Sequence, residues 1–166
     1  MALLARLMRV EFLVDHPGLV PTVAAWQQAQ FGYLTPTTTL EDRTERLRRS
    51  LQKDALPMAF IALSANGTLL GSAGILPATI THKHLTPWLS SVYVPEEFRG
   101  KGIASALSLR AIAEAARLGF DRLYLFTPHN ETLYARLGFR IFERIDYSGL
   151  PLALMERQIS ALASGS

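Results

Sequence analysis

Residues 99–104, Arg-Gly-Lys-Gly-Ile-Ala, have the composition of a phosphate-binding turn. They follow a β-branched and aromatic run that stops at Pro95, and they precede a segment whose apolar residues recur at helical spacing. This order predicts a strand, a glycine-rich turn and a helix N-terminus, where N–H groups lack intrahelical partners and the helix dipole is positive. Glycines admit close approach of a phosphate, and Arg99 and Lys101 add charge. The segment therefore predicts a site for a phosphorylated ligand, with a pyrophosphate favoured.

The spacing within this turn does not fit two common nucleotide-binding motifs. The Rossmann fingerprint requires G-x-G-x-x-G/A, but Ser105 stands at its last position, and the P-loop string G-x-x-x-x-G-K-[ST] does not occur. An alternative without a ligand stays open, in which the glycines serve only the geometry of a tight turn.

The pattern Arg99-x-x-Gly102-x-Ala104 after a strand resembles the coenzyme A signature of the GNAT N-acetyltransferases, Q/R-x-x-G-x-G/A. A second, softer resemblance lies in residues 130–139, where a tyrosine stands four residues before a Gly-Phe pair. The aromatic, Thr-rich stretch 31–39 and Pro87-Trp88 are similar to small bacterial members of the family. Almost the whole chain follows the family's element order. The resemblance implies an acetyl-coenzyme A-dependent enzyme that acetylates a primary amine of a small molecule, peptide or protein directly.

The resemblance also implies roles for individual residues. It makes Tyr134 the general acid, and it expects a main-chain N–H of Val92, Tyr93 or Val94 to bind the thioester oxygen as charge builds on it. Thr127 stands where the family often has an asparagine, and Asn130 either contacts the cofactor or caps the following helix. The expected coenzyme A contacts are Val92, Tyr93, Val94, Arg99, Gly100, Lys101, Gly102, Ile103, Ala104, Thr127, Asn130 and Tyr134, and the expected acceptor contacts are Trp26, Phe31, Tyr33 and Trp88.

Acetyl transfer to an amine needs a group that protonates the departing thiolate and a group that accepts the proton of the amine. A phenol is protonated at neutral pH, so Tyr134 can supply a proton to the departing thiolate, although a plain core tyrosine fits the same position. The base stays unassigned. Its candidates are Glu96, Glu97, His82, His84, His129, and Ser90 acting through a water. His82 and His84 fall on one face of an extended segment, but no third ligand accompanies them, so no metal site is expected.

Acceptor choice is expected to come from loops around residues 35–39 and 79–88. Four arginines within residues 43–49 fit either an acidic acceptor or a solvated helix face with internal ion pairs. A second function also stays open: a module of the same fold that senses coenzyme A or an acyl derivative without turnover.

Length and composition limit the number of domains and the classes of protein that this chain can belong to. The 166 residues, 49% of them hydrophobic, predict a single domain over 1–166, with 160–166 as a frayed tail. The absence of cysteine excludes disulfides, thiolate zinc sites and an acyl-cysteine intermediate. A net charge of +3 is too diffuse to indicate nucleic acid, and no apolar run reaches a membrane-spanning length. A cytoplasmic monomer or homodimer is expected.

The elements that must position these residues alternate strands and helices in the order β-α-α-β-β-β-α-β-α-β-β. This order predicts an α/β (α+β) fold with a mixed, mostly antiparallel, twisted sheet flanked by helices. The run 123–127 is continuously apolar and is expected to be buried on both faces. The predicted strands are 9–14, 59–63, 68–76, 88–94, 123–127, 140–147 and 152–156, and the predicted helices are 17–30, 39–51, 102–118 and 131–137.

Overall fold

The computed structural model describes residues 7–159 and contains a seven-stranded sheet in the order β1-β2-β3-β4-β5-β7-β6. Neighbouring strands are antiparallel except β4 and β5, which are parallel. The predicted fold class and element order are therefore confirmed. The strands are β1 (Arg9–Phe12), β2 (Met58–Leu63), β3 (Leu69–Leu76), β4 (Trp88–Tyr93), β5 (Arg122–Thr127), β6 (Arg140–Tyr147) and β7 (Leu150–Gln158), and the helices are α2 (Val20–Phe31), α3 (Leu40–Arg49), α4 (Ile103–Arg117) and α5 (Glu131–Arg136).

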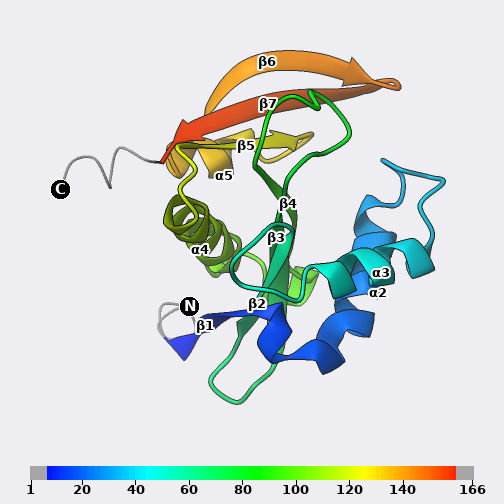
Figure 1. Ribbon diagram of the computed structural model, residues 1–166, viewed down its shortest axis with the longest axis vertical. Helices are drawn as coiled ribbons and strands as arrows, with labels where there is room; N and C mark the ends of the chain where they lie inside the picture. Colours follow the sequence, from blue (N-terminus) through cyan, green and yellow to red (C-terminus); the bar gives the residue numbers. More distant parts are fainter. Residues whose placement is uncertain (1–6, 160–166) are drawn as a thin grey trace.

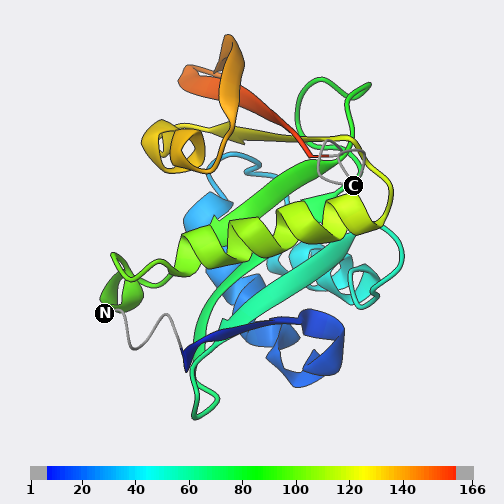
Figure 2. The same ribbon diagram turned by 90° about the vertical axis from the view of Figure 1, so that its left-hand side faces the viewer.

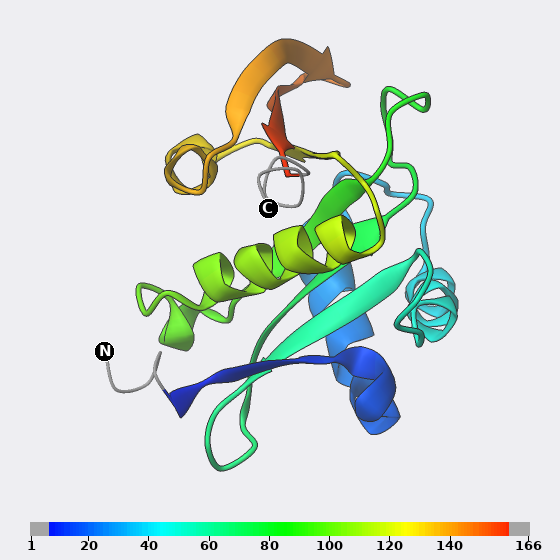
Figure 3. The same cartoon turned by 60° about the vertical axis from the view of Figure 1, so that its left-hand side comes forward.

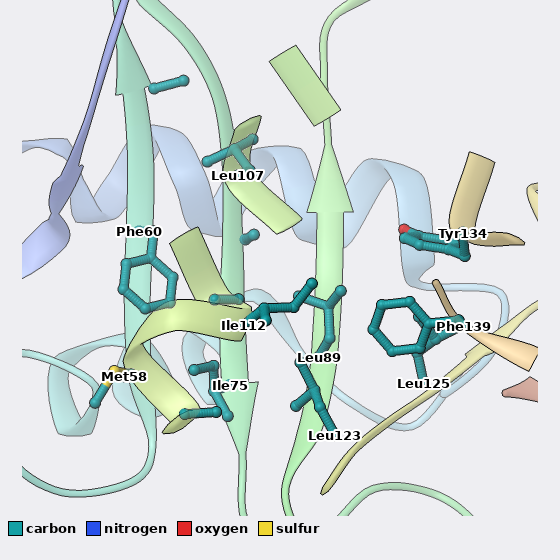
Figure 4. Packing of buried hydrophobic residues seen from close by; sticks show 14 of the residues in the cluster. Met58, Phe60, Ile75, Leu89, Leu107, Ile112, Leu123, Leu125, Tyr134 and Phe139 are labelled. Carbon is teal, nitrogen blue, oxygen red and sulfur yellow. The ribbon is translucent and has the colours of Figure 1, made fainter. Parts of the chain in front are cut away.

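Helices cover both faces of the sheet, with α4 on one face and α2 and α3 on the other (Figure 1, Figure 2 and Figure 3). Strand β2 is buried along its whole length, because its side chains alternate between two faces of the sheet and helices cover both faces. Met58 and Phe60 pack into the cluster under α4 (Figure 4), whereas Ala59 and Ile61 pack against α2 and α3. Burial on both faces fixes β2 in the sheet, and β3 lies between β2 and β4.

Helix α3 begins with a capping box formed by Thr39 and Asp42. The Thr39 hydroxyl accepts a hydrogen bond from the Asp42 N–H at 3.0 Å, and the Asp42 carboxylate accepts one from the Thr39 N–H at 2.9 Å. These bonds lower the pKa of Asp42. Both satisfy N–H groups that the first turn leaves without intrahelical partners, so they fix the start of α3.

Replacing Thr39 by alanine is expected to destabilise the fold by about 1 kcal/mol, because the side-chain half of this cap is lost. For a protein of this size that corresponds to roughly 2–4 °C in the melting temperature. Thr37→Ala is the matched control, since Thr37 is exposed just outside the helix. Equal melting temperatures for the two variants would show that the cap contributes nothing.

The parallel strands β4 and β5 meet at one end only. Their paired positions are limited to Trp88 and Tyr124, supported by a hydrogen bond from the Tyr124 N–H to the Pro87 carbonyl at 3.0 Å. Beyond this point the strands separate, and in Figure 1 β5, β7 and β6 lie across the direction of β3 and β4. The sheet is therefore split on one side of its middle, and this separation between β4 and β5 is here called the slot.

Strand β5 differs from the prediction of a strand buried on both faces. Leu123 and Leu125 are buried against the α4 side, but Tyr124 and Phe126 are only half-buried. The reason is the split itself, because Phe126 borders an open cavity instead of a covering helix.

Smaller corrections concern element ends. The first strand stops at Phe12 because the chain turns into a 3-10 helix at Leu13–Asp15, and the first long helix starts at Val20 after a second 3-10 turn. Hairpins around Gly67 and Gly149 join β2 to β3 and β6 to β7. The predicted tail at 160–166 lies outside the described residues. No helix among residues 7–159 is long and apolar enough to cross a membrane.

Candidate active site

The turn before α4 presents main-chain N–H groups to open space. Gly100 and Gly102 have φ of +77° and +81°, a region that glycine adopts without strain. No side chain caps α4 at Gly102, and the first main-chain bond of the helix runs from the Ala106 N–H to the Gly102 carbonyl at 3.0 Å. The N–H groups of the first helical turn are thus left for a ligand. A Cβ added at either glycine would meet no protein atom within 4 Å.

The side chain of Arg99 folds back over this turn. Its Nε donates to the Val94 carbonyl at 2.9 Å, so the turn is tied to the end of β4. The bond orients the guanidinium, and its two terminal nitrogens make no hydrogen bond to residues 7–159. Lys101 lies outside the cavity-lining residues, whereas Ile103 is buried and contributes main chain at the helix start.

Two cavities meet between β4 and α5. The first, here called the α3 cavity, has a volume of about 600 Å³ and extends from the ends of β4 and β5 to α3. The second, the α4 cavity, has about 660 Å³ and extends from β4 to the turn before α4. Both volumes are in the range of small-molecule sites. The residues that line both are Gln30, Val92, His129, Asn130 and Tyr134.

A bulge in β4 lies where the two cavities join. Ser72 of β3 pairs with Tyr93, but Gly74 pairs with Ser90, so β4 carries one extra residue between these pairs. Within it Ser91 has φ of +57°, an uncommon conformation for serine. A bulge removes main-chain groups from the ladder and re-aims them. Ser91 and Val92 both line the α3 cavity, and Val92 also lines the α4 cavity, so the bulge lies where the two cavities join.

Tyr134 stands on the other side of the slot. It extends from α5 with its hydroxyl end toward β4, and its ring meets Phe139 edge-on at 6.0 Å between centroids (Figure 4). The side chain is 7% exposed, and burial raises the pKa of Tyr134 to about 12. No hydrogen-bond partner of the hydroxyl is found among residues 7–159. A protonated phenol with an unengaged hydroxyl therefore lies at the junction of the cavities.

Thr127 and Asn130 organise the loop between β5 and α5. The Thr127 hydroxyl oxygen accepts hydrogen bonds from the N–H groups of His129 at 3.3 Å and Asn130 at 2.9 Å. Thr127 is 3% exposed, so its first role is to hold this loop. The Asn130 side chain does not cap α5, and it lines both cavities instead. Of the two alternatives for Asn130, the helix cap is not formed, and contact with the cofactor stays a prediction.

Only some of the candidate general bases line the two cavities. Glu96 and Glu97 line neither cavity, and His82 is held by Glu143 at 2.8 Å. His129 lines both cavities and Ser90 lines the α3 cavity. In the part of the chain that the structure describes, no group of three or more His, Cys, Asp or Glu is placed to hold a metal ion.

The expected acceptor contacts divide into two pairs. Phe31 and Tyr33 line the α3 cavity. Trp88 does not, and its assignment is wrong: it is fully buried, donates from Nε1 to the Leu85 carbonyl at 2.7 Å and packs on Tyr124. Trp26 also lies outside both cavities and packs on Tyr93 at 5.1 Å between ring centroids. Both tryptophans therefore pack against the strands of the site, Trp88 against β5 and Trp26 against β4, and do not line the cavities.

Sequence reasoning missed three kinds of residue. The Ser91 bulge carries no glycine or proline that would signal it. Gln30 is the last residue of the helix predicted from the sequence and the penultimate residue of α2, and it lines both cavities. By sequence, Arg43, Arg46 and Arg49 fit either an acidic acceptor or a solvated helix face, and in the structure all three line the α3 cavity. Their spacing of three residues on one helix was the available signal.

The family model for GNAT acetyltransferases matches residues 20–139, which include α2, the turn before α4 and Tyr134. The chain belongs to the acetyltransferase (GNAT) family. The Escherichia coli (strain K12) protein with the curated name uncharacterized N-acetyltransferase YjgM is 35% identical over 94 residues, covering 54% of this chain and 54% of its own. The match thus spans about half the length of that GNAT relative.

Solved GNAT-fold structures resemble the chain over nearly its full length. The spermidine/spermine N-acetyltransferase SpeG from Vibrio cholerae, in complex with manganese ions, has a TM-score of 0.70 at 17% identity, covering 98% of this chain and 99% of that chain. Aminoglycoside 6'-acetyltransferase type Ii has a TM-score of 0.69 at 18% identity, covering 91% and 97%. At such identities the likeness shows the fold, and the acceptor must be argued from this chain's own cavity.

Proposed function

We propose that this GNAT member is an N-acetyltransferase that transfers the acetyl group of acetyl-coenzyme A directly to a primary amine. The observation that carries the proposal is the uncapped N-terminus of α4, which opens into a cavity that joins a second cavity at Tyr134. A diphosphate at the first N–H groups of α4 is favoured by hydrogen bonds and by the helix dipole. The rest of the cofactor then extends along β4 toward Tyr134.

Each side of the slot supplies one part of the chemistry. Acetyl-coenzyme A supplies an activated acyl carbon, and the amine reaches it from the α3 cavity. Main-chain N–H groups at the Ser91 bulge are the proposed donors to the carbonyl oxygen, a contribution of roughly 3–4 kcal/mol where such donors are pre-organised. Tyr134 is the proposed acid: as the C–N bond forms and the C–S bond breaks, its phenol protonates the departing sulfur. The proton lost by the amine leaves to solvent or to His129.

Acetyl transfer is tested by mixing the protein with acetyl-coenzyme A and a panel of amines and measuring thiol release together with acetylated product. The proposal expects amine-dependent release at a rate well above the spontaneous one. The alternative, a coenzyme A sensor, is favoured by the lack of Asp and Glu among the described residues that line either cavity. Cofactor binding without release on any amine would support the sensor, and no binding at all would reject both.

The raised pKa of Tyr134 predicts how the rate depends on pH. An acid acts in its protonated form, so the phenol's contribution is present below a pKa of about 12 and is lost only above it. We therefore expect the ratio of wild-type to Tyr134→Phe kcat to stay constant between about pH 7 and pH 10. A ratio that falls toward one across this interval would mean that the phenol ionises in the ordinary range, against its burial.

A further inference from the structure

The α3 cavity is lined by cationic side chains and by no carboxylate. The residues with permanent positive charge in its lining are Arg43, Arg46 and Arg49 of α3 and Lys83 of the loop before β4. Among the described residues of the lining there is no Asp or Glu. The protein as a whole has 17 Lys and Arg against 14 Asp and Glu, so this imbalance is local and does not follow from the composition.

Arg43 is the buried member of this group. It is 7% exposed, and two neutral groups orient its guanidinium: Nε donates to Gln28 Oε1 at 2.6 Å and Nη2 donates to Thr35 Oγ1 at 2.9 Å. Nη1 has no hydrogen-bond partner among residues 7–159. Burying a charge that no counter-charge neutralises is costly, so a fixed guanidinium with a free donor in a cavity wall indicates an anion site.

The neighbouring charges increase this cost. Burial lowers the pKa of Arg43, and the positive charge of Arg46 lowers it further. Within residues 7–159, none of Arg43, Arg46, Arg49 and Lys83 forms an ion pair with a carboxylate. Arg48 of the same helix, which lies outside the cavity lining, pairs with Glu45 at 3.4 Å. Helix α3 therefore neutralises the arginine outside the cavity and leaves the three in its wall unpaired.

We propose that the α3 cavity accepts an amine that also carries an oxyanion, a carboxylate or a phosphate, which Arg43 and Arg46 bind while the amine end faces Tyr134. This inference rests on the proposed function and names its substrate class. A planar guanidinium with free N–H donors matches the oxygens of such a group. The same wall repels polyamines and aminoglycosides, because their several positive charges would face four cations without a counter-charge.

The acceptor class is tested with amines of equal chain length and different ends: 4-aminobutyrate, butylamine and 1,4-diaminobutane, together with glutamate, phosphoethanolamine and spermidine. Anionic amines are expected to have a kcat/KM at least tenfold above that of neutral or dicationic ones. Glutamate and phosphoethanolamine then separate carboxylate from phosphate recognition. A best acceptor that is neutral or polycationic would overturn the inference while leaving acetyl transfer itself intact.

Charge reversal within α3 provides the matched variants. Arg46→Glu is expected to lower kcat/KM for the best anionic acceptor by at least tenfold without changing the KM for acetyl-coenzyme A. Arg48→Glu is the control, since it makes the same charge change on the same helix outside the cavity. If both variants lower kcat/KM equally, the change in net charge explains the loss, and the proposed anion site is overturned.

A binding measurement without acetyl-coenzyme A separates this inference from the proposed function. Glutarate at constant ionic strength is expected to raise the melting temperature of the wild type and of Gly102→Asp, whose change lies at α4, but not that of Arg46→Glu. If glutarate has these effects but no amine is acetylated, the anion site is supported and the proposed acetyltransferase activity is rejected. Acetyl transfer without any effect of glutarate or of Arg46→Glu would keep the enzyme and reject the anion site.

Discussion

Gly102→Asp is expected to weaken the binding of acetyl-coenzyme A by roughly 30- to 150-fold. The change places a carboxylate at the N-cap of α4, beside the N–H groups that the helix leaves uncapped. Two unit charges about 4 Å apart near a protein surface repel by about 4 kcal/mol, and screening by salt reduces this to about 2–3 kcal/mol. The carboxylate also accepts hydrogen bonds from the amides that the diphosphate needs. Calorimetric titration measures the affinity directly.

Gly67→Asp is the matched control for this variant. Gly67 has φ of +86°, close to the +81° of Gly102, and a Cβ at either position meets no protein atom within 4 Å. Both substitutions therefore cause similar backbone strain, of about 1–2 kcal/mol, and add the same charge. Gly102→Asp should lose less thermal stability than Gly67→Asp, because its carboxylate caps α4, but only Gly102→Asp should lose affinity. If the two kept the same affinity for acetyl-coenzyme A, the diphosphate would not lie at the start of α4.

Tyr134→Phe is expected to lower kcat by about 100-fold and to leave the KM for acetyl-coenzyme A within about threefold. Proton donation to a leaving group contributes about 10²–10⁴ in rate, and a thiolate that leaves readily places this case at the low end. The phenyl ring keeps its contact with Phe139, and the missing hydroxyl leaves no described partner unsatisfied. The fold should therefore be unaffected. The change in kcat, measured by steady-state kinetics, then reports the contribution of proton donation by Tyr134.

Tyr124→Phe controls for the loss of a phenol outside the slot, at the point where β4 and β5 are paired. Tyr124 is half-buried on β5 and packs on Trp88, but it lines neither cavity. Its substitution should leave kcat unchanged. A Tyr134→Phe variant as active as the Tyr124→Phe variant would remove Tyr134 from the reaction and leave it the role of a core tyrosine.

The parts of the fold that the sequence predicts are those set by local rules. The capping box at Thr39 and Asp42, the turn at Gly67 and the strand, turn and helix around Gly102 depend on residues within a few positions of one another. Each of these local features is present in the structure. The turn before α4 was therefore recognisable from six residues.

The parts that the sequence does not predict depend on residues far apart in the chain. Trp88 looks like a site residue beside Pro87, but packing on β5 and β7 buries it. The Ser91 bulge follows from the mismatch between β3 and β4 and not from the residue itself. Whether Arg43 and Arg46 face solvent or a cavity depends on the split between β4 and β5, which no single segment encodes.

Main-chain amide shifts during a titration with coenzyme A test the proposed cofactor site most directly. In a ¹⁵N–¹H spectrum of the wild type, the resonances of Gly100, Gly102, Ile103, Ala104 and Ser105 are expected to move most, followed by those at the Ser91 bulge. The N–H groups at the start of α4 would then bind the diphosphate and aim the rest of the cofactor along β4. Saturating coenzyme A that leaves the amides at residues 100–105 unmoved, or moves only those of distant elements, would contradict the proposed site.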